Sequence, residues 1–84
     1  MSYSVFFLPR ADREFAALSK ADFERVKRAI DGLAENPRPM NCKKLRGREG
    51  WRIRAGNYRV VYDIDDSVRT VMVVTIGHRR EVYR

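Results

Sequence analysis

The chain has 84 residues, 44% of them hydrophobic and 11% aromatic, and its 18 Lys and Arg against 11 Asp and Glu give a net charge of +7. This length predicts a single domain, which we place at residues 1–84, with a small core. One Cys and one His exclude a disulfide framework and predict no metal site. The sequence has no glycine-rich phosphate loop, so we expect no cofactor. It also shows no membrane-spanning run and no evident signal peptide, so we expect a cytoplasmic protein without a membrane partner.

The positive charge is concentrated in the second half of the chain. Residues 43–84 carry eleven basic and five acidic side chains, whereas residues 1–42 carry seven and six. Of the 18 basic residues 14 are Arg, whose flat guanidinium suits phosphate and stacks on bases. Such a basic stripe favours a nucleic-acid partner. The alternative is a solvated basic face that aids solubility.

The first half predicts one strand and two helices. Residues 3–8 are aromatic and β-branched and predict a strand that ends at Pro9. Helical spacing of apolar side chains then predicts a short helix, at Ala11, Phe15 and Leu18. Ser19 with Asp22 three residues later is a capping signature for a second helix, which Asn36-Pro37 ends. The apolar stripe of this helix is Phe23, Val26, Ile30 and Leu33.

The second half predicts strands. Residues 51–55 and 58–64 flank the two-residue turn signal Gly56-Asn57, and a second turn is expected at residues 65–67. Residues 68–76 predict a central strand buried on both faces, which Gly77 is expected to break. The predicted fold is α+β: an N-terminal strand, an antiparallel two-helix hairpin, and a mostly antiparallel sheet of three to four strands.

The hairpin turn at Gly56-Asn57 fixes which side chains share a face. It predicts that Arg54 lies opposite Arg59, with Arg52 on the same face. The other face is then apolar and meets the helices: Trp51, Ile53, Ala55, Tyr58, Val60 and Tyr62. Two facing arginines repel, and a bound phosphate or acidic partner would remove that cost. In the alternative, the arginines splay apart on a solvated face.

Other groups near the arginines have two interpretations each. Lys43, Lys44, Arg46 and Arg48 form either a rim that holds backbone phosphate or an ordinary charged loop. Metal-free RNA cleavage needs a base for the 2′-hydroxyl, charge stabilisation at phosphorus and an acid for the 5′-oxygen. Tyr83 and His78 are the candidates for proton transfer. The alternatives are a frayed terminal residue for Tyr83 and a loop histidine for His78.

Four segments together resemble the RelE family of bacterial toxin endoribonucleases: residues 44–47, 51–54, 58–62 and 76–83. The resemblance covers nearly the whole chain. It implies a toxin of a type II toxin–antitoxin system that inhibits translation. Members cleave mRNA in the ribosomal A site by metal-free attack of a 2′-hydroxyl.

The resemblance also implies roles for individual residues. Arg52 and Arg54 correspond to a basic pair that is lysine in the best-known members, so charge stabilisation is expected of them. Arg59 would hold the scissile phosphate, Arg79 would assist the leaving group, and Tyr83 would act as the base or orient it. The segment between Gly77 and Tyr83 is shorter than in those members and contains His78, to which a proton-transfer role would then shift.

The implied partners are a RelB-like antitoxin, mRNA and the 70S ribosome with 16S rRNA at its A site, and operator DNA only through the antitoxin complex. Two other functions remain open. A ParE-like toxin would inhibit DNA gyrase without nuclease activity, and a non-catalytic module would only bind RNA or the ribosome.

Overall fold

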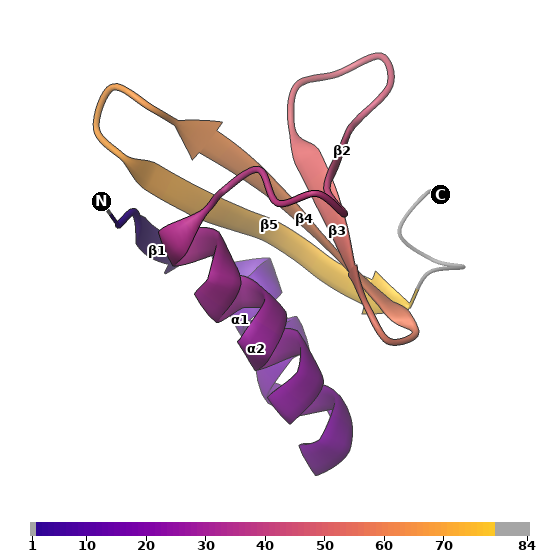
Figure 1. Cartoon of the computed structure of the whole chain (residues 1–84). Coiled ribbons are helices and arrows are strands. Elements are labelled where there is room, and N and C mark those ends of the chain that lie inside the picture. The colour runs from indigo at the N-terminus through magenta and orange to yellow at the C-terminus, as the bar shows by residue number, and fades with distance from the viewer. Residues whose placement is uncertain (1, 79–84) are drawn as a thin grey trace.

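The computed structural model describes residues 2–78, and there the chain runs as one strand, two helices and four further strands (Figure 1). The elements are β1 (Ser4–Phe7), α1 (Pro9–Ala16), α2 (Lys20–Glu35), β2 (Lys43–Lys44), β3 (Trp51–Ala55), β4 (Tyr58–Asp65) and β5 (Thr70–His78). α1 contacts β5 and β1, whereas α2 contacts β3, β4 and β1. The predicted α+β fold is confirmed.

The strands form one mixed sheet in the order β1-β5-β4-β3-β2. β1 pairs with β5 in parallel, and every other neighbouring pair in this sheet of residues 4–78 is antiparallel. The sheet has five strands, slightly more than predicted, because the N-terminal strand joins its edge beside β5. This parallel pairing brings the two halves of the chain into one structure.

The start and end of β5 differ from the sequence prediction. The strand begins at Thr70 and not at Val68, because Arg69 adopts a left-handed conformation with φ of 53° that belongs to the preceding turn. Gly77 does not break the strand: it pairs with Arg59, and His78 pairs with Tyr58. β5 therefore extends two residues beyond the predicted end.

The second helix begins and ends where the sequence predicts. The Ser19 side chain accepts a hydrogen bond from the Asp22 backbone N–H at 3.3 Å and its hydroxyl donates to the Asp22 carboxylate at 3.0 Å. The helix ends at Glu35 with Asn36 as its C-cap, because the prolines that follow cannot continue it. Its buried residues come from the predicted apolar stripe: Val26, Ile30 and Leu33.

Aromatic rings join the helices to the first strand. Phe15 of α1 stacks on Phe7 of β1 and on Phe23 of α2, with ring centroids 5.4 and 4.3 Å apart. Glu14 of the same helix accepts hydrogen bonds from the Ile76 backbone N–H at 3.0 Å and the Thr75 hydroxyl at 2.8 Å. Glu14 thus accepts a hydrogen bond from the β5 backbone at a position where the pairing with β1 has already ended. These hydrogen bonds fix α1 against the sheet.

The core lies between the helices and one face of the sheet, called here the inner face. Tyr62, Val60 and Ile53 are fully buried or nearly so, as predicted for the apolar face of the hairpin. Val61 is also buried although its position in the strand places it on the outer face. No helix among residues 2–78 is long and apolar enough to cross a membrane.

Candidate active site

The β3–β4 hairpin has the predicted register. Arg54 lies opposite Arg59, and Arg52 lies opposite Val61. Gly56 opens the two-residue turn with φ of 63°, a conformation that glycine adopts without steric cost. A Cβ at this position would lie 2.7 Å from Cδ of Arg25 on α2. The turn therefore requires glycine at position 56. Because the turn fixes the register of the hairpin, it also places the side chains of Arg52, Arg54 and Arg59 on the same face of the sheet.

The outer face carries a basic pocket of about 340 Å³. Its lining residues come from three neighbouring strands and the segment before them: Asn41, Lys43, Arg52, Arg54 and Arg59. The ladder explains this grouping, because Lys43 pairs with Arg52 across β2 and β3 while Arg54 pairs with Arg59 across β3 and β4. Side chains of paired residues lie on the same face of a sheet.

The charges that line the basic pocket suit an anion. It has four cationic side chains and, within the described part of the chain, no carboxylate among its lining residues. Two arginines facing each other in a ladder destabilise the sheet, and a phosphate between them reverses the sign of that interaction. Arg59 is half-buried and Arg54 exposed, so the pocket reaches from the surface into the sheet.

On the β5 side, Arg59 has a glycine as its neighbour in the ladder. Its ladder partner in β5 is Gly77, which has no side chain to cover the outer face at that point. The glycine expected to end the strand instead lies within it, next to the candidate site.

His78 is placed on the other side of the sheet from the basic pocket. It pairs with Tyr58, whose side chain belongs to the inner face, and the two rings meet edge to face with centroids 5.9 Å apart. Arg79 and Tyr83 lie outside the described residues. The structure thus groups Arg52, Arg54, Arg59 and Lys43 on one face of the sheet.

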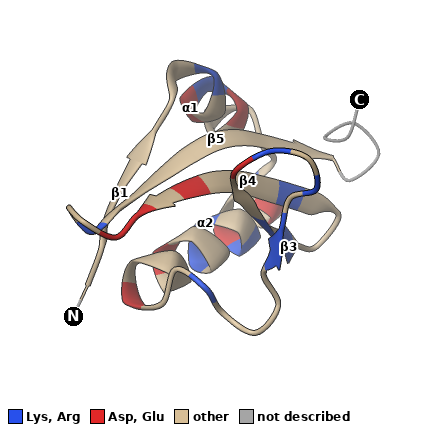
Figure 2. Cartoon of the chain, turned by 90° about the horizontal axis from the view of Figure 1, so that it is seen from above, with Lys and Arg blue, Asp and Glu red and all other residues tan. Residues whose placement is uncertain are grey.

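The other basic residues of the predicted rim have separate locations. Arg46 and Arg48 are exposed on the loop that joins β2 to β3, which a hydrogen bond from the Leu45 N–H to the Gly50 carbonyl closes at 3.0 Å. Lys44 lines a second cavity, described next, and not the basic pocket. Figure 2 shows basic residues gathered around β3 and the adjoining loop.

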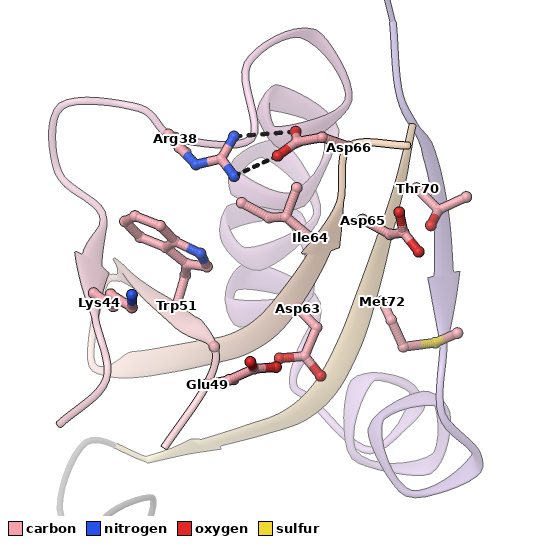
Figure 3. Close-up of a pocket in the computed structure, with 11 residues that line it drawn as sticks. Arg38, Lys44, Glu49, Trp51, Asp63, Ile64, Asp65, Asp66, Thr70 and Met72 are labelled. Atoms are coloured by element: carbon pink, nitrogen blue, oxygen red, sulfur yellow. Dashed lines mark hydrogen bonds and ion pairs between the residues drawn. The ribbon is translucent and has the colours of Figure 1, made fainter. Parts of the chain in front are cut away.

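A second groove of about 520 Å³ lies beside Trp51, and four of its eleven lining residues are acidic (Figure 3). Its acidic residues are Glu49, Asp63, Asp65 and Asp66. On β4, side-chain alternation places Arg59 on the outer face near one end of the strand and Asp63 and Asp65 on the same face near the other, so this face is basic at one end and acidic at the other. Figure 2 shows this division as red segments along β4 and blue ones around β3.

Arg38 closes one end of the second groove. Its guanidinium binds both carboxylate oxygens of Asp66, at 3.2 and 2.8 Å, and lies over the Trp51 ring at 5.3 Å from the centroid (Figure 3). The hydrogen bond from Arg38, with a further one from the Tyr3 hydroxyl, lowers the pKa of Asp66 to about 2. Among residues 2–78, no group of three or more His, Cys, Asp and Glu side chains is arranged to hold a metal ion.

Two residues near the site, Asn41 and Arg38, are not predicted from the sequence. Asn41 lines the basic pocket, but it is uncharged and comes before Lys43, the first basic residue of the pocket. The pattern of basic residues therefore does not include it. Arg38 contacts Asp66, which lies 28 positions away in the sequence. Pro37 and Pro39, on either side of Arg38, indicate a rigid segment. They do not predict the contact of Arg38 with Asp66, because a contact between residues far apart in the chain leaves no periodic pattern in the sequence.

Comparison with known proteins gives the family. Residues 5–83 match the family model for the ParE toxin of the parDE type II toxin–antitoxin system. The chain is 33% identical over 88 residues to the mRNA interferase toxin RelE of Escherichia coli K12, covering 99% of this chain and 92% of that protein.

Solved structures agree with this assignment. The toxin–antitoxin complex RelBE2 of Mycobacterium tuberculosis matches with a TM-score of 0.81 and 31% identity, over 94% of this chain and all of that one. The intact E. coli RelBE complex matches with a TM-score of 0.76 and 31% identity, over 92% of this chain and 96% of that one. The chain therefore belongs to the RelE/ParE family of toxins from type II toxin–antitoxin systems.

Proposed function

We propose that this chain is an endoribonuclease toxin that cleaves mRNA in the ribosomal A site and so stops translation. The observation that carries the proposal is the basic pocket, in which three adjacent strands present four cations on one face. A protein that only inhibits DNA gyrase has no need of such a phosphate-binding cluster. The similarity to a relative named mRNA interferase toxin supports the same function.

The proposed reaction is transfer of the scissile phosphate to the neighbouring ribose. The 2′-oxygen loses its proton to a base and forms a bond to phosphorus, while the bond from phosphorus to the 5′-oxygen breaks and that oxygen gains a proton. The products are a 2′,3′-cyclic phosphate and a 5′-hydroxyl. Arg59 would hold the scissile phosphate, with Arg52 and Arg54 stabilising the charge that develops in the transition state.

The remaining roles are proposed for the end of the chain and the rim. Arg79 would support the leaving group, and Tyr83 would transfer protons. His78, the other residue predicted for proton transfer, packs its ring against Tyr58 on the inner face, on the other side of the sheet from the basic pocket. Lys43 lines the pocket itself. Lys44, Arg46 and Arg48 would hold phosphates of the RNA at some distance from the scissile one.

The proposed partners follow from charge and from the relatives. A net charge of +7 favours mRNA and 16S rRNA in the 70S ribosome, and it favours an acidic antitoxin that neutralises the surface. Structures of relatives with RelB support a RelB-like antitoxin. Binding to operator DNA would occur only through the antitoxin complex.

The test is incubation of the antitoxin-free chain with mRNA, with and without programmed ribosomes, followed by mapping of the cut ends. Cuts that need ribosomes and carry cyclic phosphate and 5′-hydroxyl ends are expected. Arg59→Ala should abolish them, while Arg28→Ala on the exposed face of α2 should not. Absence of cuts, together with inhibition of gyrase supercoiling, would overturn the proposal in favour of a gyrase inhibitor.

A further inference from the structure

Asn41 differs in chemistry from the other residues that line the basic pocket. Lys43, Arg52, Arg54 and Arg59 carry hydrogen-bond donors and positive charge, whereas the Asn41 amide is neutral and offers both two donors and an acceptor. A phosphate presents acceptors only and is already matched by the four cations. A nucleobase edge presents donors and acceptors side by side, which an amide can pair with in two hydrogen bonds.

The basic pocket has room for more than a phosphate. Its volume of about 340 Å³ corresponds to roughly eleven waters at ~30 Å³ each. Cavities of this size hold small organic ligands. The pocket can therefore contain part of a nucleoside next to the phosphate that the arginines bind.

Residues 36–42 hold Asn41 at the pocket through fixed contacts. The Tyr62 hydroxyl donates to the Pro37 carbonyl at 2.7 Å from inside the core. The next residue, Arg38, is held by Asp66 through two hydrogen bonds at 3.2 and 2.8 Å. The Cys42 N–H donates to the Pro39 carbonyl at 2.9 Å and closes the turn that carries Asn41.

Rigid support of this kind is what a recognition residue needs. Two prolines flank Arg38 and restrict the backbone, so little conformational freedom is lost when a ligand binds. Asn41 itself is exposed, and it stands two residues before Lys43, where β2 begins. The segment thus places the Asn41 amide, which is neutral and both donates and accepts hydrogen bonds, at the edge of the basic pocket.

We propose that Asn41 is a specificity-determining residue that hydrogen-bonds the edge of a base next to the scissile phosphate. This inference rests on the proposed function. Adenine suits an asparagine amide best, because its N6 donor and N7 acceptor match the amide oxygen and nitrogen. Asn41 then selects where the chain cuts, while the arginines bind any phosphate.

The experiment compares Asn41→Ala and Asn41→Asp with the unchanged chain on a set of mRNAs whose codons vary only at the cleavage site. The matched control is Asn57→Ala, which removes an exposed asparagine from the hairpin turn outside the pocket lining. For each codon, kcat/KM is measured on programmed ribosomes. Thermal unfolding establishes that all four proteins are folded.

Asn41→Ala is expected to lower kcat/KM roughly tenfold at the preferred base and much less at the others, so that the base preference flattens. Asn41→Asp should lower it further, since a carboxylate repels the phosphate and loses the amide donors. Asn57→Ala should keep the preference of the unchanged chain. The salt dependence of RNA binding should stay the same in Asn41→Ala, because no phosphate contact is removed.

Two results would overturn the inference while leaving the nuclease in place. One is an unchanged order of preferred bases in Asn41→Ala, and the other is an equal loss of rate at every codon, which would make Asn41 a general positioning residue. If the unchanged chain makes no cuts at all, the proposed nuclease fails and the role of Asn41 fails with it.

Discussion

Arg54 and Arg59 lie directly opposite each other in the β3–β4 ladder, on the outer face of the sheet. Like charges in this position destabilise a sheet by some tenths of a kcal/mol. With Arg52 and Lys43 beside them, they line one cavity together with Asn41. This pairing is expected to lower the stability of the free protein, and under the proposed function a bound phosphate would offset that cost.

Replacing Arg54 by Gln should therefore stabilise the free protein. Relief of the repulsion from Arg59 is expected to raise the free energy of unfolding by about 0.2–1 kcal/mol, which shifts Tm upward by a few degrees. Thermal unfolding at low salt measures this gain. It should vanish at 1 M salt, where the Debye length is about 3 Å. Arg28→Gln on α2 is the control; a gain of equal size there would contradict the assignment of the effect to the arginine pair.

Stability should depend on core residues and not on the pocket. Ile30→Ala leaves a cavity in α2 where the side chain is 4% exposed, and it is expected to cost about 2–5 kcal/mol. Arg59→Ala should change the unfolding free energy by about 1 kcal/mol or less, because it opens no core cavity and relieves the repulsion from Arg54. Chemical denaturation of both variants measures the difference. Unfolding of Arg59→Ala at 25 °C would show that this side chain is structural.

Acid should weaken the contact between Arg38 and Asp66. The pKa of Asp66 is lowered to about 2 in the folded protein, so its contribution is fully present above the unfolded value near 4. That contribution is lost as the pH falls from about 4 toward 2. Tm measured across this range should fall less steeply in Arg38→Gln than in the unchanged chain. Some slope persists, because the hydrogen bond from the Ser67 hydroxyl also lowers the pKa of Asp65. An unchanged slope would mean that Arg38 does not stabilise the Asp66 carboxylate in solution.

The buried hydroxyl of Tyr62 should support the segment that carries Asn41. Tyr62→Phe leaves the Pro37 carbonyl without its donor and is expected to cost about 1–3 kcal/mol. Burial raises the pKa of Tyr62 well above its usual value, so the hydroxyl keeps its proton and the loss should be the same from pH 5 to pH 9. Denaturant unfolding at the two pH values tests both points. A loss that varies with pH would contradict the assignment to a protonated hydroxyl.

The sequence predicted those features that depend on local patterns. The Gly56-Asn57 turn and the alternation of Trp51 to Ala55 were enough to give the register of the hairpin and the common face of its arginines. Ser19 and Asp22 gave the start of α2 in the same way. In each case, neighbouring residues alone determine the geometry.

Features that depend on distant contacts could not be predicted in this way. The parallel pairing of β1 with β5 joins residues more than 60 positions apart, such as Ser4 and Thr70. The placement of Asn41 depends on Tyr62 and Asp66, which lie far along the chain. The position of His78 was missed for a different reason: Gly77 was expected to end the strand, but the ladder with β4 continues through it.

The most direct test of the central claim, that the basic pocket cleaves mRNA, is the rate of cleavage on programmed ribosomes for the unchanged chain and for Arg59→Ala. Ribosome affinity is measured alongside by co-sedimentation. We expect the variant to lose about 10²-fold or more in rate while its affinity falls far less, since Arg59 acts on charge that develops in the transition state. Equal losses in rate and affinity would contradict a catalytic pocket and would make Arg59 a binding residue only.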